Sequence, residues 1–116
     1  MNGSFLLDTN IVIALFAAER IVKEKIRQAD KIFVPSVVLG ELYYGALISG
    51  RVKENMNRLN AFAGDQSVLV CDLVTARMYG EVKHGLRQKG RPIPENDIWI
   101  AAIALQHDLT LVARDS

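Results

Sequence analysis

Residues 5–10 read Phe5-Leu6-Leu7-Asp8-Thr9-Asn10 and form the most informative short stretch of the chain. Three consecutive apolar residues are too few for a helix and are typical of a strand that is buried on both faces, as in a parallel sheet. The run stops at a carboxylate, a hydroxyl and an amide. These polar residues are suited to begin a helix, and they are also placed to line a site, because sites in open α/β sheets form beyond the carboxyl ends of the strands.

The rest of the chain alternates in the same way between short apolar runs and longer periodic segments. We expect strands over residues 5–7, 32–34, 68–70 and 109–112. Helices are expected between them, over residues 9–18, 20–28, 37–48, 52–62, 73–88 and 95–106, with Asp72 as the N-cap of the fifth. Strands that alternate with helices predict an α/β domain in which helices cover both faces of a central parallel sheet.

Length and composition favour one domain with a substantial core, since half of the 116 residues are apolar. The net charge of +1 lacks the basic excess of many nucleic-acid-binding domains, so an anionic partner would have to be held locally. No signal peptide or membrane-spanning segment is predicted. The single Cys71 cannot form an internal disulfide and lies in an apolar stretch, so we interpret it as a core thiol in a cytoplasmic protein.

Four carboxylates are candidates for a site. Asp8 and Asp115 follow the first and last strands, although Asp8 alone could simply cap a helix and Asp115 lies next to the chain end. Glu41 has almost only uncharged helical neighbours and is expected on a buried face. A buried carboxylate needs a partner, and an arginine is the structural alternative to a metal ion.

The fourth candidate, Asp97, opens the last predicted helix. A stripe of Ile98, Ala101, Ala102 and Leu105 is expected to face the core, which would point Asp97 inward and Glu95 outward. Acidic residues in a first turn also favour the helix dipole, so neither residue is decisive alone.

Taken together, the four carboxylates are predicted to converge on one crevice, and a bound divalent cation would relieve their mutual repulsion. Oxygen ligands suit Mg²⁺ or Mn²⁺. His84 and His107 lack zinc-ligand spacing with each other or with Cys71 and are interpreted as surface or helix-end residues.

Four segments then carry a family resemblance: LLDTN, VVLGELYYGA, ENDIWIAAIAL and LVARDS, in this order. They resemble the PIN-domain ribonucleases, most closely the VapC toxins of prokaryotic toxin–antitoxin pairs, and the resemblance covers essentially the whole chain. It implies a three-layer α/β/α sandwich. It also implies that Asp8, Glu41 and Asp97 correspond to the three acidic metal-site residues of the family, and Asp115 to a less uniform fourth.

The resemblance carries further expectations. Thr9 would match the hydroxyl beside the first acid, and Asn96 a polar neighbour of the third. The implied activity is Mg²⁺- or Mn²⁺-dependent endoribonuclease hydrolysis, in which the metal activates a water for in-line attack on RNA. Residues 1–116 would form one PIN domain. Family members usually continue past the position of Asp115, so a missing short C-terminal segment is an open alternative.

The implied partners are RNA, a cognate VapB-type antitoxin and a second copy of the chain. The basic residues Arg87, Lys89 and Arg91 precede Asp97 in a loop that could reach the site, and Arg114 is a further candidate for RNA contact. An ordinary solvated helix end explains the first three equally well. Antitoxin or dimer contacts could come from the apolar helix over residues 11–16 and from Tyr43 and Tyr44. Core packing is nevertheless favoured for Ile11, Ile13, Leu15 and Phe16.

Three other readings compete. A phosphotransferase of the haloacid dehalogenase kind needs a second Asp two residues after Asp8, where this chain has Asn10. A receiver domain would use Asp72 as phosphate acceptor, but it needs a pair of acids at the end of the first strand, where Asp8 has no acidic neighbour. A catalytically silent PIN-like binding module is the remaining alternative.

Overall fold

The computed structural model describes residues 3–113 of the chain. Within them, four parallel strands form one sheet in the order β3-β2-β1-β4. The strand bounds are Ser4–Leu7 (β1), Lys31–Pro35 (β2), Ser67–Leu69 (β3) and Thr110–Val112 (β4). Strand β1 lies between β2 and β4, so its carboxyl end has a neighbouring strand end on each side.

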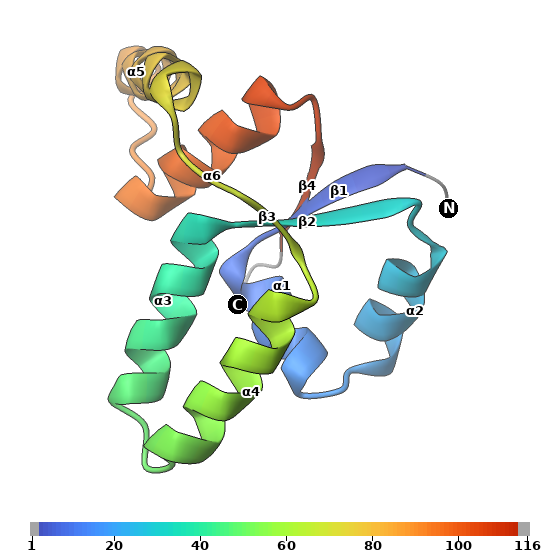
Figure 1. Ribbon diagram of the computed structural model, residues 1–116. Coiled ribbons are helices and arrows are strands. Elements are labelled where there is room, and N and C mark those ends of the chain that lie inside the picture. The colour runs from blue at the N-terminus through green and yellow to red at the C-terminus, as the bar shows by residue number, and fades with distance from the viewer. Residues whose placement is uncertain (1–2, 114–116) are drawn as a thin grey trace.

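Six helices connect or flank these strands: α1 (Thr9–Phe16), α2 (Arg20–Gln28), α3 (Ser36–Leu47), α4 (Val52–Gly64), α5 (Leu73–Gln88) and α6 (Glu95–Gln106). In Figure 1, α5 and α6 lie above the sheet and α1 to α4 lie below it. The predicted α/β class and three-layer α/β/α sandwich are therefore confirmed. Neither α1 nor α3 is separated from the strand before it by more than one residue, so both helices start at the carboxyl edge of the sheet.

The core is built from the apolar runs that predicted β1 and β2, together with apolar faces of the helices. Leu6, Leu7 and Val34 are fully buried, and Ile100 and Ile103 of α6 pack with them. Burying a side chain of this size contributes about 1.5–3 kcal/mol, so this central cluster is the main support of the β1 and β2 strand ends.

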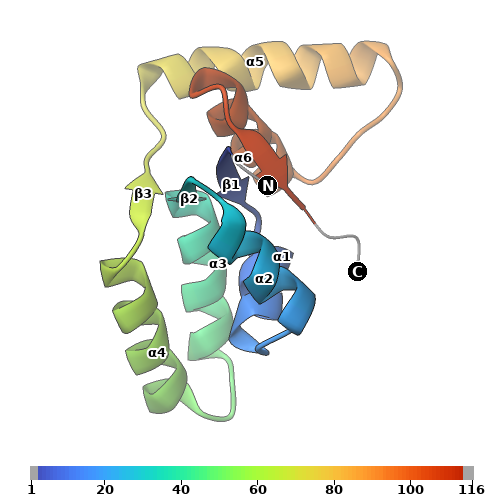
Figure 2. The same cartoon turned by 90° about the vertical axis from the view of Figure 1, so that its right-hand side faces the viewer.

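Helix α5 forms an outer element that packs mainly on α6 (Figure 2). The predicted N-cap is confirmed: Asp72 Oδ1 accepts a hydrogen bond of 3.1 Å from the Thr75 backbone N–H and one of 2.9 Å from Gln106 Nε2. The buried Thr75 hydroxyl also bonds Gln106. At its other end, α5 stops where Gly90 takes a φ of +64°, which turns the chain toward α6.

Several expectations about the burial of apolar residues are wrong, including burial of the third strand, where Val68 and Val70 are exposed. Cys71 is exposed, because the short edge strand β3 ends at Leu69 and the chain leaves the sheet before the thiol. Ile13 is half exposed, because α1 turns Ile11 and Val12 toward the sheet and Ile13 away from it. Leu105 is exposed although the rest of α6 is largely buried. No helix in residues 3–113 is long and apolar enough to cross a membrane.

Candidate functional site

One side-chain hydrogen bond joins the carboxyl end of β1 to α3. The Thr9 hydroxyl donates to Glu41 Oε1 at 2.9 Å, and both residues are partly buried. Thr9 opens α1 just after β1, and Glu41 lies in the second turn of α3, which begins directly after β2. The adjacent strands β1 and β2 thus bring these two residues to the same edge of the sheet.

Asp8 occupies the position between β1 and α1. Its backbone N–H donates to the Val112 carbonyl at 3.1 Å, which holds Asp8 beside the end of β4. Its Oδ1 accepts from the Ile11 backbone N–H at 2.9 Å, so the helix-capping interpretation is confirmed. A carboxylate has about four acceptor positions, and a capping bond is therefore compatible with a ligand role.

The expectation that Glu41 is buried is wrong, and the structural alternative to a metal ion, a salt bridge to an arginine, is not observed in the part of the chain that the structure describes. Glu41 is half-buried, and no salt bridge to it forms within residues 3–113. Its uncharged helical neighbours Tyr44, Gly45 and Ile48 are themselves exposed, so an uncharged face of α3 is not a buried one. Glu41 instead lies at a cavity of about 320 Å³ between α1, α3 and α4.

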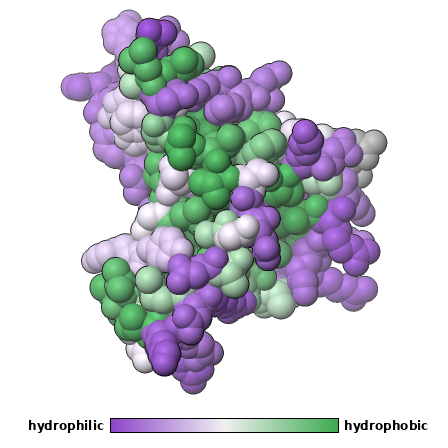
Figure 3. Space-filling view, in the orientation of Figure 1, coloured by the Kyte–Doolittle hydropathy of each residue, from purple (hydrophilic) through white to green (hydrophobic). Residues whose placement is uncertain are grey.

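Asp97 lies in the first turn of α6 and is exposed, as are Glu95 and Asn96, so the expectation that it points inward is wrong. The burial of α6 begins one residue later, at Ile98. Helix α6 contacts α3. Figure 3 shows a surface indented at the left between the α5–α6 layer and α3, the two parts of the fold that carry Asp97 and Glu41.

The predicted acids do not form a finished metal cluster. Among residues 3–113, no three His, Cys, Asp or Glu side chains lie close enough to hold a metal ion together. The predicted fourth acid, Asp115, lies outside the described residues. The structure thus brings Thr9 and Glu41 together, with Asp8 next along the chain. The ligand roles of Asp8, Glu41, Asp97 and Asp115 stay predictions.

A contact between α5 and α6 was not predicted. Lys83 Nζ donates to Glu95 Oε1 at 2.6 Å, the Tyr79 hydroxyl also bonds Glu95, and the Tyr79 ring stacks on Trp99 with centroids 4.0 Å apart. Hydrogen bonds from Lys83 and Tyr79 lower the pKa of Glu95, and the bond to Glu95 raises the pKa of Lys83. Only the spacing of Tyr79 and Lys83, four residues apart on one helix face, hinted at such a contact.

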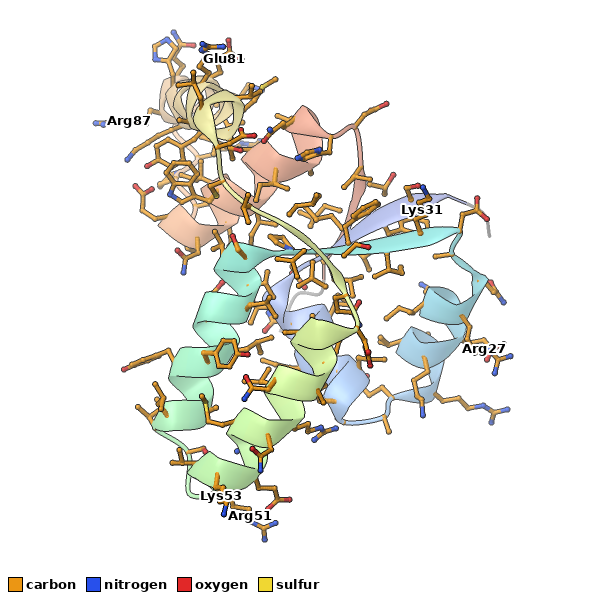
Figure 4. All side chains as sticks on the ribbon, viewed as in Figure 1. Arg27, Lys31, Arg51, Lys53, Glu81 and Arg87 are labelled. Carbon is orange, nitrogen blue, oxygen red and sulfur yellow. The ribbon has the colours of Figure 1, made fainter. Side chains whose placement is uncertain are left out.

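The basic residues predicted to contact RNA lie at the end of α5 and in the loop that leads to α6. Arg87, Lys89 and Arg91 are all exposed. Figure 4 shows Arg87 at the upper left, beside α5, projecting away from the body of the molecule. Arg114 lies outside the described residues. His84 and His107 are exposed, and His107 caps the end of α6, as expected.

Comparisons with known proteins show the family to which this chain belongs. Residues 5–116 match the family model described as PIN domain. Ribonuclease VapC2 of Haemophilus influenzae is 34% identical over 113 residues, which cover 96% of this chain and 86% of that protein. The tRNA(fMet)-specific endonuclease VapC of Shigella flexneri is 32% identical over 114 residues, covering 97% and 86%.

The structural comparison agrees. A chain from the crystal structure of VapBC2 of Rickettsia felis, bound to a DNA fragment from their promoter, superposes with a TM-score of 0.87 at 28% identity, covering 97% of this chain and 87% of that chain. This chain therefore belongs to the PIN-domain family and, within it, to the VapC ribonucleases.

Proposed function

We propose that this protein is a metal-dependent endoribonuclease, the VapC-type toxin of a toxin–antitoxin pair, which hydrolyses phosphodiester bonds of RNA. The family relationship supports the activity, since similar proteins are named ribonucleases. The structural observation that carries it is the 2.9 Å bond from Thr9 to Glu41, which orients the Glu41 carboxylate at the sheet edge where Asp8 follows β1. A silent binding module is not favoured, because it would not need this arrangement.

The donor set fits a hard divalent cation. Asp8 and Glu41 offer carboxylate oxygen atoms, which suit Mg²⁺ or Mn²⁺. Asp8, Glu41, Asp97 and Asp115 would hold the ion. When bound, such an ion lowers the pKa of a water and stabilises charge on phosphate oxygens.

The other residues of the chain have supporting roles in this proposal. Thr9 orients Glu41 through its hydroxyl, and Asn96 offers a polar contact beside Asp97. Arg87, Lys89, Arg91 and Arg114 would bind the phosphates of RNA, which compensates locally for the nearly neutral net charge of the chain.

A VapB-type antitoxin is the proposed inhibitor, supported by the similarity to the VapBC2 complex of R. felis. Exposed apolar side chains on the α1 and α3 surface offer contacts for a partner chain, and they include Ile13, Tyr44, Leu47 and Ile48. A homodimer is proposed as well, and the cytoplasm as the site of action, where RNA substrates and reduced thiols are found together.

The test is cleavage of a total cellular RNA pool, with initiator tRNA included because the S. flexneri relative is named for it. Asp8→Asn keeps the helix cap, since Asn caps as well as Asp, and removes one ligand charge. Asp65→Asn, an exposed carboxylate at the end of α4, is the matched control. Fragments that require Mg²⁺ or Mn²⁺ and Asp8, but not Asp65, would support the proposal. Folded Asp8→Asn protein that still cleaves would overturn the site.

A further inference from the structure

The first turn of α6 lacks a side-chain cap. Its N-cap is Pro94, which offers no side-chain capping bond, and the loop that precedes it is exposed. The backbone N–H groups of Asp97 and Ile98 share one acceptor, the Pro94 carbonyl, at 3.0 and 3.2 Å. A helix start of this kind frays readily unless a neighbouring element holds it.

Two residues of α5 hold this turn from one side. Lys83 and Tyr79 both bond the Glu95 carboxylate, and Tyr79 also stacks on Trp99 with ring planes 17° apart. Lys83 further donates to the Tyr79 hydroxyl at 3.1 Å. Tyr79 and Lys83 are four residues apart on α5, and Glu95 and Trp99 are four apart on α6. Each pair therefore shares a helix face, and the four side chains connect one face of α5 to one face of α6. We call this group the α5–α6 clamp: Tyr79, Lys83, Glu95 and Trp99.

The clamp and Asp97 lie on opposite faces of α6. At 3.6 residues per turn, Asp97 is rotated by about 200° from Glu95, and Trp99 by about 200° from Asp97. Glu95 and Trp99 therefore share the face toward α5, and Asp97 is presented on the other side of the helix. A clamp on the back of the turn can fix the Asp97 backbone without touching a metal or RNA.

We propose that the α5–α6 clamp is a positioning device, which keeps the first turn of α6 helical so that Asp97 is held ready to bind the divalent ion. This inference rests on the proposed function, in which Asp97 is a ligand. Lys83 and Glu95 are positioning residues here, because neither belongs to the predicted ligand set. The paired side chains are 37% and 56% exposed, so the expected effect of losing one pair is moderate.

The test uses Lys83→Met, which keeps most of the aliphatic stem and removes the charge, with Lys83→Arg as the conservative variant. Arg51→Met is the matched control, since it removes a salt bridge of 3.5 Å to Glu54 at the far end of the molecule, where Figure 4 labels Arg51. Three measurements are made on the full chain without RNA. They are amide hydrogen exchange at Asp97 and Ile98, the near-ultraviolet circular dichroism of Trp99, the only tryptophan, and Mn²⁺ affinity by calorimetry.

Lys83→Met is expected to speed exchange at the two amides about threefold to fivefold, to weaken Mn²⁺ binding by a similar factor and to reduce the Trp99 signal. Lys83→Arg and Arg51→Met are expected to resemble the unmodified chain. Unchanged exchange and Mn²⁺ affinity in Lys83→Met, or equal effects in Arg51→Met, would overturn the clamp. Failure of the unmodified chain to bind Mn²⁺ would instead overturn the proposed metal site, and the positioning role with it.

Discussion

Thr9 and Glu41 lie 32 positions apart in the chain and share a hydrogen bond of 2.9 Å, which crosses from the start of α1 to the second turn of α3. Because β1 and β2 are adjacent and parallel, the helices that follow them start side by side. The bond gives Glu41 a neutral donor, and this leaves the carboxylate its charge for binding a cation.

Thr9→Val is the first prediction from this contact. Valine keeps the shape and removes the donor, so Glu41 loses its orienting bond and the protein loses about 0.5–1.5 kcal/mol of stability. We expect RNA cleavage to fall about tenfold, because a ligand that is no longer held binds the metal less well. Thr9→Ser, which restores the hydroxyl, should recover most of the activity. Full activity in Thr9→Val would show that Glu41 needs no orientation by Thr9.

Much of the fold could be predicted from the sequence, because continuous apolar runs mark buried parallel strands and polar residues mark their ends. The four strands and six helices lie within a few residues of their expected bounds. The strand order could not be predicted, since every strand is short and apolar and nothing local specifies its neighbour. Exposure was also poorly predicted: Cys71 and Ile13 lie in apolar stretches, but edge strands and half-covered helices leave such residues at the surface.

The candidate site was predicted in part for the same reason. Asp8 and Glu41 follow strand ends, so the alternation of elements brings them to one edge. Asp97 was expected to point inward because its neighbour Ile98 is apolar, yet burial starts only at Ile98. The clamp between Lys83 and Glu95 could not be foreseen, because the pairing depends on how α5 packs on α6, and the sequence does not encode that packing locally.

The polar contact at the other end of the α5–α6 pair gives the second prediction. Thr75 is fully buried, and its hydroxyl bonds both Asp72 and Gln106. Thr75→Val should destabilise the protein by about 1–3 kcal/mol, because it leaves these partners without their bonds. Thr110→Val, the same change at an exposed strand position, should stay within about 0.5 kcal/mol. Urea denaturation of both variants measures this, and equal small effects would contradict the role given to Thr75.

The clamp makes the third prediction, on pH. The pKa of Glu95 is lowered from its ordinary 4.5, chiefly by the hydrogen bond from Lys83, so its contribution to stability is present above that value and is lost as pH falls through the lowered one. The difference in Tm between the unmodified chain and Lys83→Met should therefore be largest near neutral pH and shrink as pH falls below 4.5. Thermal melts from pH 3 to 8 measure it.

The same comparison contains its own control. The pKa of Asp72 is also lowered, mainly by the bond from the Thr75 backbone, so both proteins lose this stabilisation equally in acid. Only the difference between the two melts reports on the pair of Lys83 and Glu95. A difference that does not change with pH would mean that Lys83 stabilises α6 through its aliphatic stem, without the ion pair.

Core packing on the sheet gives the fourth prediction. Ile103 is fully buried in the central cluster, whereas Ile21 on α2 is 73% exposed. Ile103→Ala should cost about 2–5 kcal/mol, because it removes buried methylene groups and leaves a cavity. Ile21→Ala, the same change at the surface, should cost less than about 1 kcal/mol. Chemical denaturation measures the loss of unfolding free energy in both variants. Similar losses would show that Ile103 of α6 is not packed in the core as described.

The fifth prediction concerns the loop between α5 and α6. Replacing Arg87, Lys89 and Arg91 with glutamine in one triple variant should weaken RNA binding. It should also lower the slope of log affinity against log salt by about 2, since each phosphate contact to a single strand contributes about 0.7. Binding is measured in the Asp8→Asn background, so that RNA stays intact. The matched control neutralises Lys23, Lys25 and Arg27 on α2, where Figure 4 shows Arg27 on the opposite side of the molecule from Arg87. An equal loss of RNA affinity in both triple variants would mean that RNA binding depends only on overall charge. An unchanged slope in the loop variant would mean that the loop is an ordinary solvated helix end.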